Sequence, residues 1–234
     1  SYLQNAEKPC LVAIDEFQQI DKYGDRNVEA TLRTYMQYCP NAHFVFSGSQ
    51  RDMMGAIFTS SARPFYQSAT IMNLPPIEEV KYAEFCRRHF ASAGKILDDD
   101  VVPELYSRFD GTTFYLQKVM NILFMRTGDG ETCVKGMIDD AVDYIIDFSS
   151  ETYGDLLYQL PEKQKLTLLA IAQEGKASGI TSGDFVSKYS LASPSSVSSA
   201  ANGLLDKGLL TCSRGVWRVY DLFFEIWLRD RYLK

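Results

Sequence analysis

Three short apolar runs stand out in the first third of the chain, each bounded by polar or turn-forming residues. They cover residues 10–15, 43–49 and 69–74. Near-continuous apolar runs of this length are typical of strands in a parallel sheet that is covered on both faces. Between the first two runs, residues 27–38 carry apolar side chains at helical spacing, which predicts a right-handed helical crossover. We therefore expect this part of the chain to be α/β.

The apolar spacing becomes helical after the pair Pro75 and Pro76 and stays helical over the next seventy residues. Apolar stripes with this period cover residues 78–90, 102–109, 116–123 and 134–145. They predict a small all-helical unit, and each stripe is expected to face a core rather than a ligand.

Three further helices are predicted from Pro161 onward. The first covers residues 162–173, and a capping box of Thr181 and Asp184 opens the second. The third begins with Ser193 as its N-cap and ends before Gly208. The side chains expected to face the core are Leu166, Leu169 and Ala170 in the first helix and Val197, Ala201, Leu204 and Leu205 in the third.

A β-hairpin is predicted after these helices. Residues 209–212 and 216–220 favour strands, and Ser213, Arg214 and Gly215 form the turn between them. Three helices followed by a hairpin is the plan of a winged helix. The predicted fold class is thus α/β plus all-α. The expected boundaries are 1–75 for a partial parallel sheet, 76–148 for the helical unit and 149–234 for the winged-helix domain.

Composition narrows the class of protein. The 234 residues are 46% hydrophobic and 23% charged, as in a soluble globular protein of one or two domains. No apolar run approaches the ~18 residues of a membrane span. Five cysteines without metal-ligand spacing favour reduced thiols in the cytoplasm and argue against zinc. The net charge of −6 argues against tight nonspecific binding to nucleic acid or to anionic lipid.

Polar residues end the first two apolar runs. The stretch LVAIDEF ends on Asp15 and Glu16, and HFVFSGS ends on Ser47, Gly48 and Ser49. Strands of a parallel sheet deliver their last residues to the carboxyl edge, where open α/β folds bind ligands. In nucleotide hydrolases such an Asp holds hydrated Mg²⁺ and the adjoining Glu orients the attacking water. Alternatively, the Asp-Glu pair only ends a strand or starts a turn.

The two strand ends resemble the Walker B and first-sensor strands of AAA+ nucleotide hydrolases. The stretches VFSGSQRDMMGAIF and SARPFYQSATIMNLPPIEEVKYAEFCRRHF extend the likeness to the archaeal-type ATPase family of the AAA+/STAND group. DGTTFYLQKV resembles the family's lid motif, and VYDLFFEIWLRDRY resembles its ending. The resemblance implies a partial P-loop NTPase sheet, a helical lid, and use of ATP and Mg²⁺. The residues it implicates are Asp15 for metal and cofactor, Glu16, Ser47 and Ser49 for catalysis, and Arg63 for the cofactor.

The sequence departs from the family in two ways. Family members often carry Gly-Arg where this chain has Gln67 and Ser68, so Arg63 or Arg51 would have to meet phosphate, unless each is an ordinary surface arginine. No G-x-x-x-x-G-K-[ST] phosphate loop occurs either. We therefore interpret the chain as the C-terminal portion of an ATPase, which alone should neither bind ATP tightly nor hydrolyse it. A naturally loopless interaction scaffold is the alternative, so whether the chain is an enzyme stays open.

The family resemblance implies that the missing phosphate-loop strand would lie between the second and third predicted strands. Its absence predicts unpaired strand edges. We expect these edges to be covered by another copy of the chain, which would make a homo-oligomer, by residues 1–9 in a rearranged position, or by a separate fragment.

A DNA-binding regulator is the competing function class. Its contacts would come from Lys207, Arg214 and Arg218 of the winged helix. However, the third helix offers mainly serines and an asparagine where sequence readers usually place Arg or Lys. A packing role or a protein partner is therefore the favoured interpretation of this domain. A STAND-type switch without rapid turnover also stays open.

Overall fold

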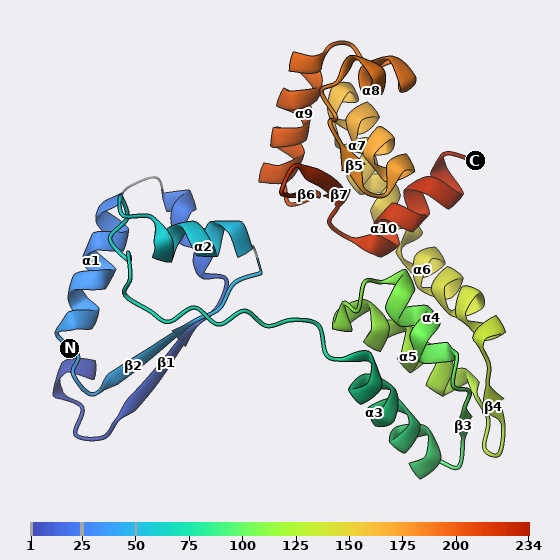
Figure 1. The fold of residues 1–234 in the computed structure, drawn as a ribbon, viewed down its shortest axis with the longest axis horizontal. Coiled ribbons are helices and arrows are strands. Elements are labelled where there is room, and N and C mark those ends of the chain that lie inside the picture. Colours follow the sequence, from blue (N-terminus) through green and yellow to red (C-terminus); the bar gives the residue numbers. More distant parts are fainter. Residues whose placement is uncertain (1, 24–25, 50) are drawn as a thin grey trace. The chain divides into compact units, whose positions relative to one another are not determined.

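The computed structural model describes residues 2–23, 26–49 and 51–234. It divides the chain into two compact units, Ser1–Leu74 and Pro75–Lys234, whose elements are labelled in Figure 1.

The first unit holds a two-stranded parallel sheet. β1 (Cys10–Ile14) pairs with β2 (Ala42–Phe46) from Cys10 opposite Ala42 to Ile14 opposite Phe46. The connection between the strands runs through the short helix η2 (Phe17–Tyr23) and the helix α1 (Arg26–Gln37), which confirms the helical crossover. The unit also contains η1 (Leu3–Asn5) and α2 (Arg51–Thr59).

One face of this sheet is covered and the other is exposed. Ile14 and Phe46 pack against a small aromatic cluster that η2, α2 and the following loop supply, with Phe17, Ile57, Phe58 and Phe65 at its buried centre. On the opposite face, Leu11 is 74% exposed and Val45 is 50% exposed. The expectation of a sheet covered on both faces is therefore wrong for the described residues.

The predicted third strand is also wrong. Residues 69–74 form no ladder in the structure and lead as an exposed segment toward the second unit. Met72 is 81% exposed and Leu74 is 76% exposed. A strand exists only if a neighbouring strand pairs with it, and residues 69–74 belong to none of the sheets in the described part of the chain. Residues 1–9 likewise form no strand against β1 or β2 in the part of them that is described.

The second unit begins with the predicted helical lid. Its helices are α3 (Glu79–Ser92), α4 (Val101–Arg108), α5 (Thr113–Arg126) and α6 (Ile138–Tyr158). Two short parallel strands, β3 (Ile96–Leu97) and β4 (Thr132–Cys133), and the turn η3 (Lys135–Met137) complete it. The expected helical stripe starts too early, because Val134 precedes α6 and is 42% exposed. The expected boundary between residues 148 and 149 falls inside α6, which continues to Tyr158.

The winged helix follows α6. Its helices are α7 (Glu162–Glu174), α8 (Gly183–Lys188) and α9 (Pro194–Asp206). β5 (Ala177–Ser178), β6 (Leu210–Ser213) and β7 (Val216–Val219) make an antiparallel sheet in the order β5-β7-β6. The chain ends in α10 (Leu222–Trp227) and η4 (Leu228–Tyr232). Three helices and a hairpin are thus confirmed.

Local details of the winged helix differ in three places. The N-cap of α8 is Ser182, whose hydroxyl accepts from the Phe185 N–H, rather than Thr181. Leu166 is 41% exposed and Leu205 is 39% exposed, so neither is a core residue. The Ser193 cap of α9 is confirmed, because its hydroxyl accepts from the Ser196 N–H at 3.2 Å.

A single hydrophobic core joins the lid and the winged helix within the second unit. It runs from Tyr82 in α3 to Leu228 at the end of the chain without a break. Among the described residues, no helix is both long enough and apolar enough to span a lipid bilayer.

Candidate functional site

The polar residues that follow β1 and β2 lie together at one edge of the sheet. The register pairs Ile14 with Phe46, so the residues after them are level with each other. The pairing continues beyond the strands, because the Ser47 N–H donates to the Ile14 carbonyl at 3.0 Å and the Phe17 N–H donates to the Ser47 carbonyl at 2.9 Å. The sequence expectation that both strand ends meet at one edge is thus confirmed by the backbone.

Asp15 accepts two hydrogen bonds on the same oxygen. The Ser47 hydroxyl donates to Oδ1 at 2.6 Å, and the Glu16 N–H donates to Oδ1 at 2.9 Å. These bonds, the one from Ser47 foremost, lower the pKa of Asp15 below its usual value, so the carboxylate is ionised at neutral pH. Because both bonds fall on Oδ1, Oδ2 is the oxygen left to face a ligand.

Glu16 is held by side chains from both strand ends. The Ser49 hydroxyl donates to Glu16 Oε2 at 3.2 Å, and Gln18 Nε2 donates to the same oxygen. Glu16 itself has φ of 50°, a conformation that non-glycine residues rarely adopt. The following residue explains it, since Phe17 is buried in the aromatic cluster and turns the chain sharply after Asp15. The site is thus tied to the core of the first unit.

Gln18 contacts Glu16, and Gly48 lies next to the Gln18 side chain. Gln18 is 1% exposed, and its Oε1 has no hydrogen-bond partner among the described residues. A Cβ at Gly48 would lie 2.2 Å from that oxygen and 2.7 Å from the Met54 sulfur, so a larger residue there would displace the side chains of Gln18 and Met54. Sequence reasoning missed Gln18, because a glutamine after a strand carries no pattern that distinguishes it from a surface residue.

The donor set of this edge fits Mg²⁺ that is held mainly by phosphate and water. Carboxylate and hydroxyl oxygens are the ligands that Mg²⁺ prefers, and one or two carboxylates suffice when a nucleotide supplies the rest. Asp15 Oδ2 meets this requirement. No group of three or more His, Cys, Asp or Glu side chains among the described residues could hold a metal without a nucleotide.

Arg63 has two carboxylate partners of its own. Its guanidinium donates to Asp21 in η2 and to Glu29 in α1, and the hydrogen bond to Asp21 contributes most to raising its pKa. Glu29 is buried, and only a fifth of the Arg63 side chain is exposed. Arg63 is therefore not an ordinary surface arginine. These ion pairs account for Arg63 without a nucleotide, and its role as a phosphate contact stays a prediction. The side chain of Arg51 lies outside the described part.

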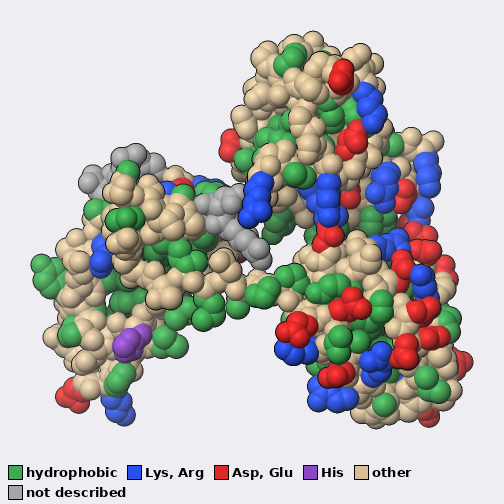
Figure 2. Space-filling model, viewed as in Figure 1, with side chains coloured by type: hydrophobic (Ala, Val, Ile, Leu, Met, Phe, Trp, Pro, Cys, Tyr) green, Lys and Arg blue, Asp and Glu red, His purple; other side chains and the backbone are tan. Residues whose placement is uncertain are grey.

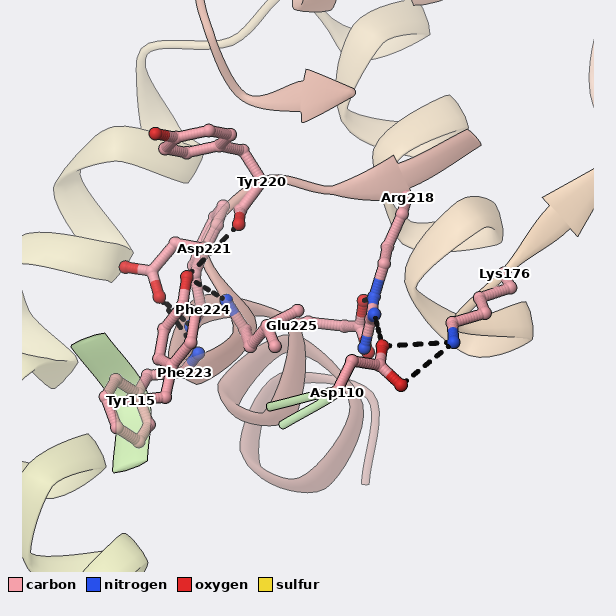
Figure 3. A network of polar contacts seen from close by, with 10 residues as sticks. Asp110, Tyr115, Lys176, Arg218, Tyr220, Asp221, Phe223, Phe224 and Glu225 are labelled. Atoms are coloured by element: carbon pink, nitrogen blue, oxygen red, sulfur yellow. Dashed lines mark hydrogen bonds and ion pairs between the residues drawn. The ribbon is translucent and has the colours of Figure 1, made fainter. Parts of the chain in front are cut away.

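A second polar network joins the lid to the winged helix within the second unit (Figure 3). Asp221 is the N-cap of α10, and its Oδ1 accepts from the Phe223 N–H at 2.9 Å. The hydroxyl of Tyr115 in α5 accepts from the Leu222 N–H at 3.1 Å and donates to the Tyr220 carbonyl at 3.2 Å. A lid tyrosine therefore caps the first turn of a winged-helix element.

A cluster of four charges continues this network. Asp110, at the start of the lid motif, binds Lys176 at 3.0 Å and also pairs with Arg218 in β7. Arg218 in turn donates to Glu225 in α10 at 3.3 Å. Burial raises the pKa of Glu225 and outweighs the opposing effect of Arg218. Burial also acts to raise the pKa of Asp110, but hydrogen bonds from Lys176 and Arg218 outweigh it and lower the value.

Comparison with known proteins bears on the fold of the chain. A family model described as a probable winged helix domain matches residues 151–230. A Walker-type ATPase of Pyrococcus abyssi matches over 94% of this chain at a TM-score of 0.63 and 17% identity. The chain shares its fold with this Walker-type ATPase and carries a winged helix in its C-terminal part. It spans 63% of the length of the Pyrococcus structure.

Two other solved structures align at lower scores. A RuvB variant of Thermotoga maritima aligns with 95% of this chain and 71% of its own at a TM-score of 0.47 and 14% identity. The structure of the ORC2 protein of Aeropyrum pernix in its ADPNP-ADP complexes aligns with a TM-score of 0.39 and 12% identity. The alignment covers 96% of this chain and 66% of the ORC2 chain. No curated protein sequence matches the chain.

The three residues predicted to contact DNA are differently placed on the winged helix. Lys207 donates to Gln164 at 2.7 Å, and Arg218 is held by Asp110 and Glu225. Arg214 lies exposed in the turn of the wing. On the face drawn in Figure 2, basic side chains of the second unit are interspersed with acidic ones. Lys207 and Arg214 are thus both exposed, and Arg218 is partly buried.

Proposed function

We propose that this chain is the Walker B, lid and winged-helix portion of an ATPase, and that Asp15 and Glu16 form its hydrolytic edge. The observation that carries the proposal is the pairing of the two strand ends. It sets an ionised Asp15 beside Ser47 and Glu16 beside Ser49, in a chain whose fold resembles that of a Walker-type ATPase. A pair of adjacent carboxylates with separate supports is suited to two different tasks.

The two carboxylates divide the work of phosphoryl transfer. Mg²⁺, when bound, would neutralise charge on the β- and γ-phosphates of ATP. Asp15 would hold the hydrated Mg²⁺ through Oδ2, while Ser47 and the Glu16 N–H keep Oδ1 in place. Glu16 orients the attacking water and accepts its proton, with Ser49 fixing Oε2. The triphosphate itself needs a loop that the 234 residues do not contain.

The uncovered face of the sheet favours the hypothesis that this chain is part of a larger ATPase. Leu11 and Val45 are large apolar side chains at least half exposed on neighbouring strands, which is costly unless another part of the protein covers them. We propose that the segment carrying the phosphate loop covers this face in the full-length protein. A second copy of the chain is the competing occupant, and light scattering on the 234-residue chain would detect that homo-oligomer.

The lid and the winged helix are proposed to respond to nucleotide as one body. They share a core and are joined by Tyr115, Asp110 and Arg218. A lid movement would therefore carry the winged helix with it. This output suits a STAND-type switch as well as a fast hydrolase, and the steady-state turnover rate of the full-length protein distinguishes the two.

Calorimetry with Mg-ATP tests the proposal. The 234-residue chain should show no tight binding, whereas the full-length protein should bind with micromolar or better affinity and release phosphate. Micromolar binding by the 234-residue chain alone would contradict the assignment, because the phosphate contacts would then lie elsewhere. Absence of binding by the full-length protein would favour the interaction scaffold instead.

A further inference from the structure

Gln18 is the buried group at the edge that the proposed mechanism does not use. Its side chain lies inside the first unit, yet its amide reaches both polar strand ends. Nε2 donates to Glu16 Oε2, after β1, and lies 3.5 Å from the hydroxyl of Ser49, after β2. Oε1 faces Gly48 and has no hydrogen-bond partner in the described structure.

The orientation of this amide follows from its neighbours. Glu16 is a carboxylate and only accepts hydrogen bonds, so the NH₂ group has to face it. Turning the amide over would set two acceptor oxygens against each other. The cost of the present orientation is a buried oxygen without a partner, which native structures rarely keep. Gln18 is therefore held by its contact with Glu16 and not by satisfaction of its own oxygen.

We propose that Gln18 is a positioning residue that fixes the carboxylate of Glu16 toward the attacking water. This inference rests on the proposed hydrolytic function of the edge. Two donors from different segments, Gln18 and Ser49, meet on Oε2, which leaves Oε1 of Glu16 as the oxygen that faces the reaction. The bare backbone of Gly48 gives Gln18 the space to reach this position.

If Gln18 only stabilised the fold, replacing it should lower the free energy of unfolding together with the activity. Replacing Gln18 by Met keeps the length of the side chain, removes the donor and also removes the unpartnered oxygen. Removing an unsatisfied buried acceptor relieves a penalty, so the variant should be at least as stable as the wild type. If the amide positions Glu16, catalysis should fall although stability does not. The two readouts move in opposite directions, which separates positioning from folding.

The test compares Gln18→Met with Gln19→Met in the full-length protein. Gln19 is exposed and adjacent, so it is the matched control. We expect Gln18→Met to lower kcat by about 10- to 100-fold, the scale of a displaced catalytic group. The KM and the calorimetric Kd for Mg-ATP should not change. In a Glu16→Gln background, Gln18→Met should lower kcat no further, because the group it positions is gone.

Two readouts do not depend on turnover. Thermal unfolding of the 234-residue chain should give Gln18→Met a Tm no lower than that of the wild type. A crystal structure of the variant should show the Glu16 carboxylate away from Ser49. As a second variant, Gly48→Ala should displace Gln18 and lower kcat in the same way.

Several outcomes overturn the inference. These are a wild-type kcat in Gln18→Met, an equal loss in Gln19→Met, a loss that adds to that of Glu16→Gln, or an unmoved Glu16 in the crystal. An inactive wild-type protein would instead contradict the proposed hydrolytic function, and the crystal structure would still decide whether Gln18 positions Glu16.

Discussion

At the ends of β1 and β2 the carboxylates are exposed and keep oxygens free for a ligand, whereas at the contact of α5 and β7 with α10 the polar side chains of Tyr115 and Glu225 are buried and are bound within the unit. Asp15 uses only Oδ1 for its two protein contacts. Glu225, in contrast, is 5% exposed and is bound by Arg218, which is shared with Asp110. Carboxylate oxygens without a protein partner at an exposed edge can bind a ligand or take part in a reaction. Buried polar groups that bind one another instead hold the lid and the winged helix together.

The surroundings of the two regions differ in the same sense. The sheet of the first unit rests on a small aromatic cluster and leaves one face uncovered. The second unit has one core from the lid to the last helix. We therefore expect substitutions at the edge to change activity more than stability, and substitutions in the lid–winged-helix contact to change stability first.

The largest effect is expected for Glu16→Gln in the full-length protein. The amide keeps the shape of the side chain but cannot accept a proton, so kcat should fall by about 10²- to 10⁴-fold while Mg-ATP binding is retained. Asp15→Ala should instead weaken Mg-ATP binding, because in the proposed site its carboxylate would hold the metal. Single-turnover phosphate release and calorimetry on both variants separate the two roles. Wild-type turnover in Glu16→Gln would contradict the proposed role of Glu16 in hydrolysis.

The next effect is expected for Arg218→Met, measured by urea denaturation of the 234-residue chain. The variant leaves Glu225 buried without its cation, and removing one partner of such a pair costs about 3 kcal/mol of unfolding free energy. Arg231 is the matched control, because it pairs with Asp143 and Asp147 at the surface. Arg231→Met should cost about 0.5 kcal/mol or less. Equal losses would show that the buried network adds no cohesion.

Tyr115→Phe should cost about 2 kcal/mol, because it leaves the buried Leu222 N–H without an acceptor. Burial raises the pKa of Tyr115 to about 12, so the hydroxyl is intact across the neutral range. Phe114→Leu is the control, since Phe114 precedes Tyr115 and is 57% exposed. Hydrogen exchange should locate the change at the start of α10. Unchanged protection of Leu222 would contradict the capping role.

The pH dependence of stability distinguishes Glu225 from an exposed glutamate. Because burial raises the folded-state pKa of Glu225, its contribution is present below the unfolded value near 4.5 and is lost as pH rises through the folded value. Relative to wild type, Glu225→Gln should therefore become more stable as the pH rises from 4 to 7.

Glu174→Gln gives the opposite sign and serves as the control. Lys188 and then Tyr189 lower the pKa of Glu174, so its contribution is present above the unfolded value and is lost as pH falls. The difference between Glu174→Gln and wild type should become less favourable as pH rises. Urea denaturation at several pH values measures both slopes. Parallel slopes for the two variants would contradict the burial of Glu225.

Local signals predicted the parts of the fold that depend on a few adjacent residues. Ser193, Pro194 and Gly208 bound α9 correctly because a cap and a stop act within one turn. Segment 69–74 failed because an apolar run becomes a strand only beside a partner, which no sequence window reveals. Leu166 and Leu205 lie at the margins of helical stripes, where period alone does not decide exposure. Ser182 and Thr181 are both good caps, and backbone geometry chose between them.

The candidate site was predictable only in part for the same reason. Asp15, Glu16, Ser47 and Ser49 follow recognisable strands, and the shared edge follows from parallel pairing. Gln18 owes its position to burial, which its type disfavours. The two motifs around Tyr115 and Asp221 were visible separately, but their contact spans more than a hundred residues of chain. Contacts over that distance depend on the whole packing of the unit.

The smallest effect is expected for Arg214→Ala in the winged helix. If the wing bound DNA, this exposed cation would neutralise one phosphate, and its loss would change the salt slope of binding by about one unit. We expect instead weak binding to duplex DNA and little change on substitution, because Arg218 and Lys207 already have protein partners. Fluorescence anisotropy from 50 to 300 mM salt measures the slope, with Lys163→Ala as an exposed control on α7. A steep slope that Arg214→Ala alone makes shallower would place the winged helix in the DNA-binding class. The second unit would then also have an exposed ligand site, at the wing, in addition to its contact with the lid.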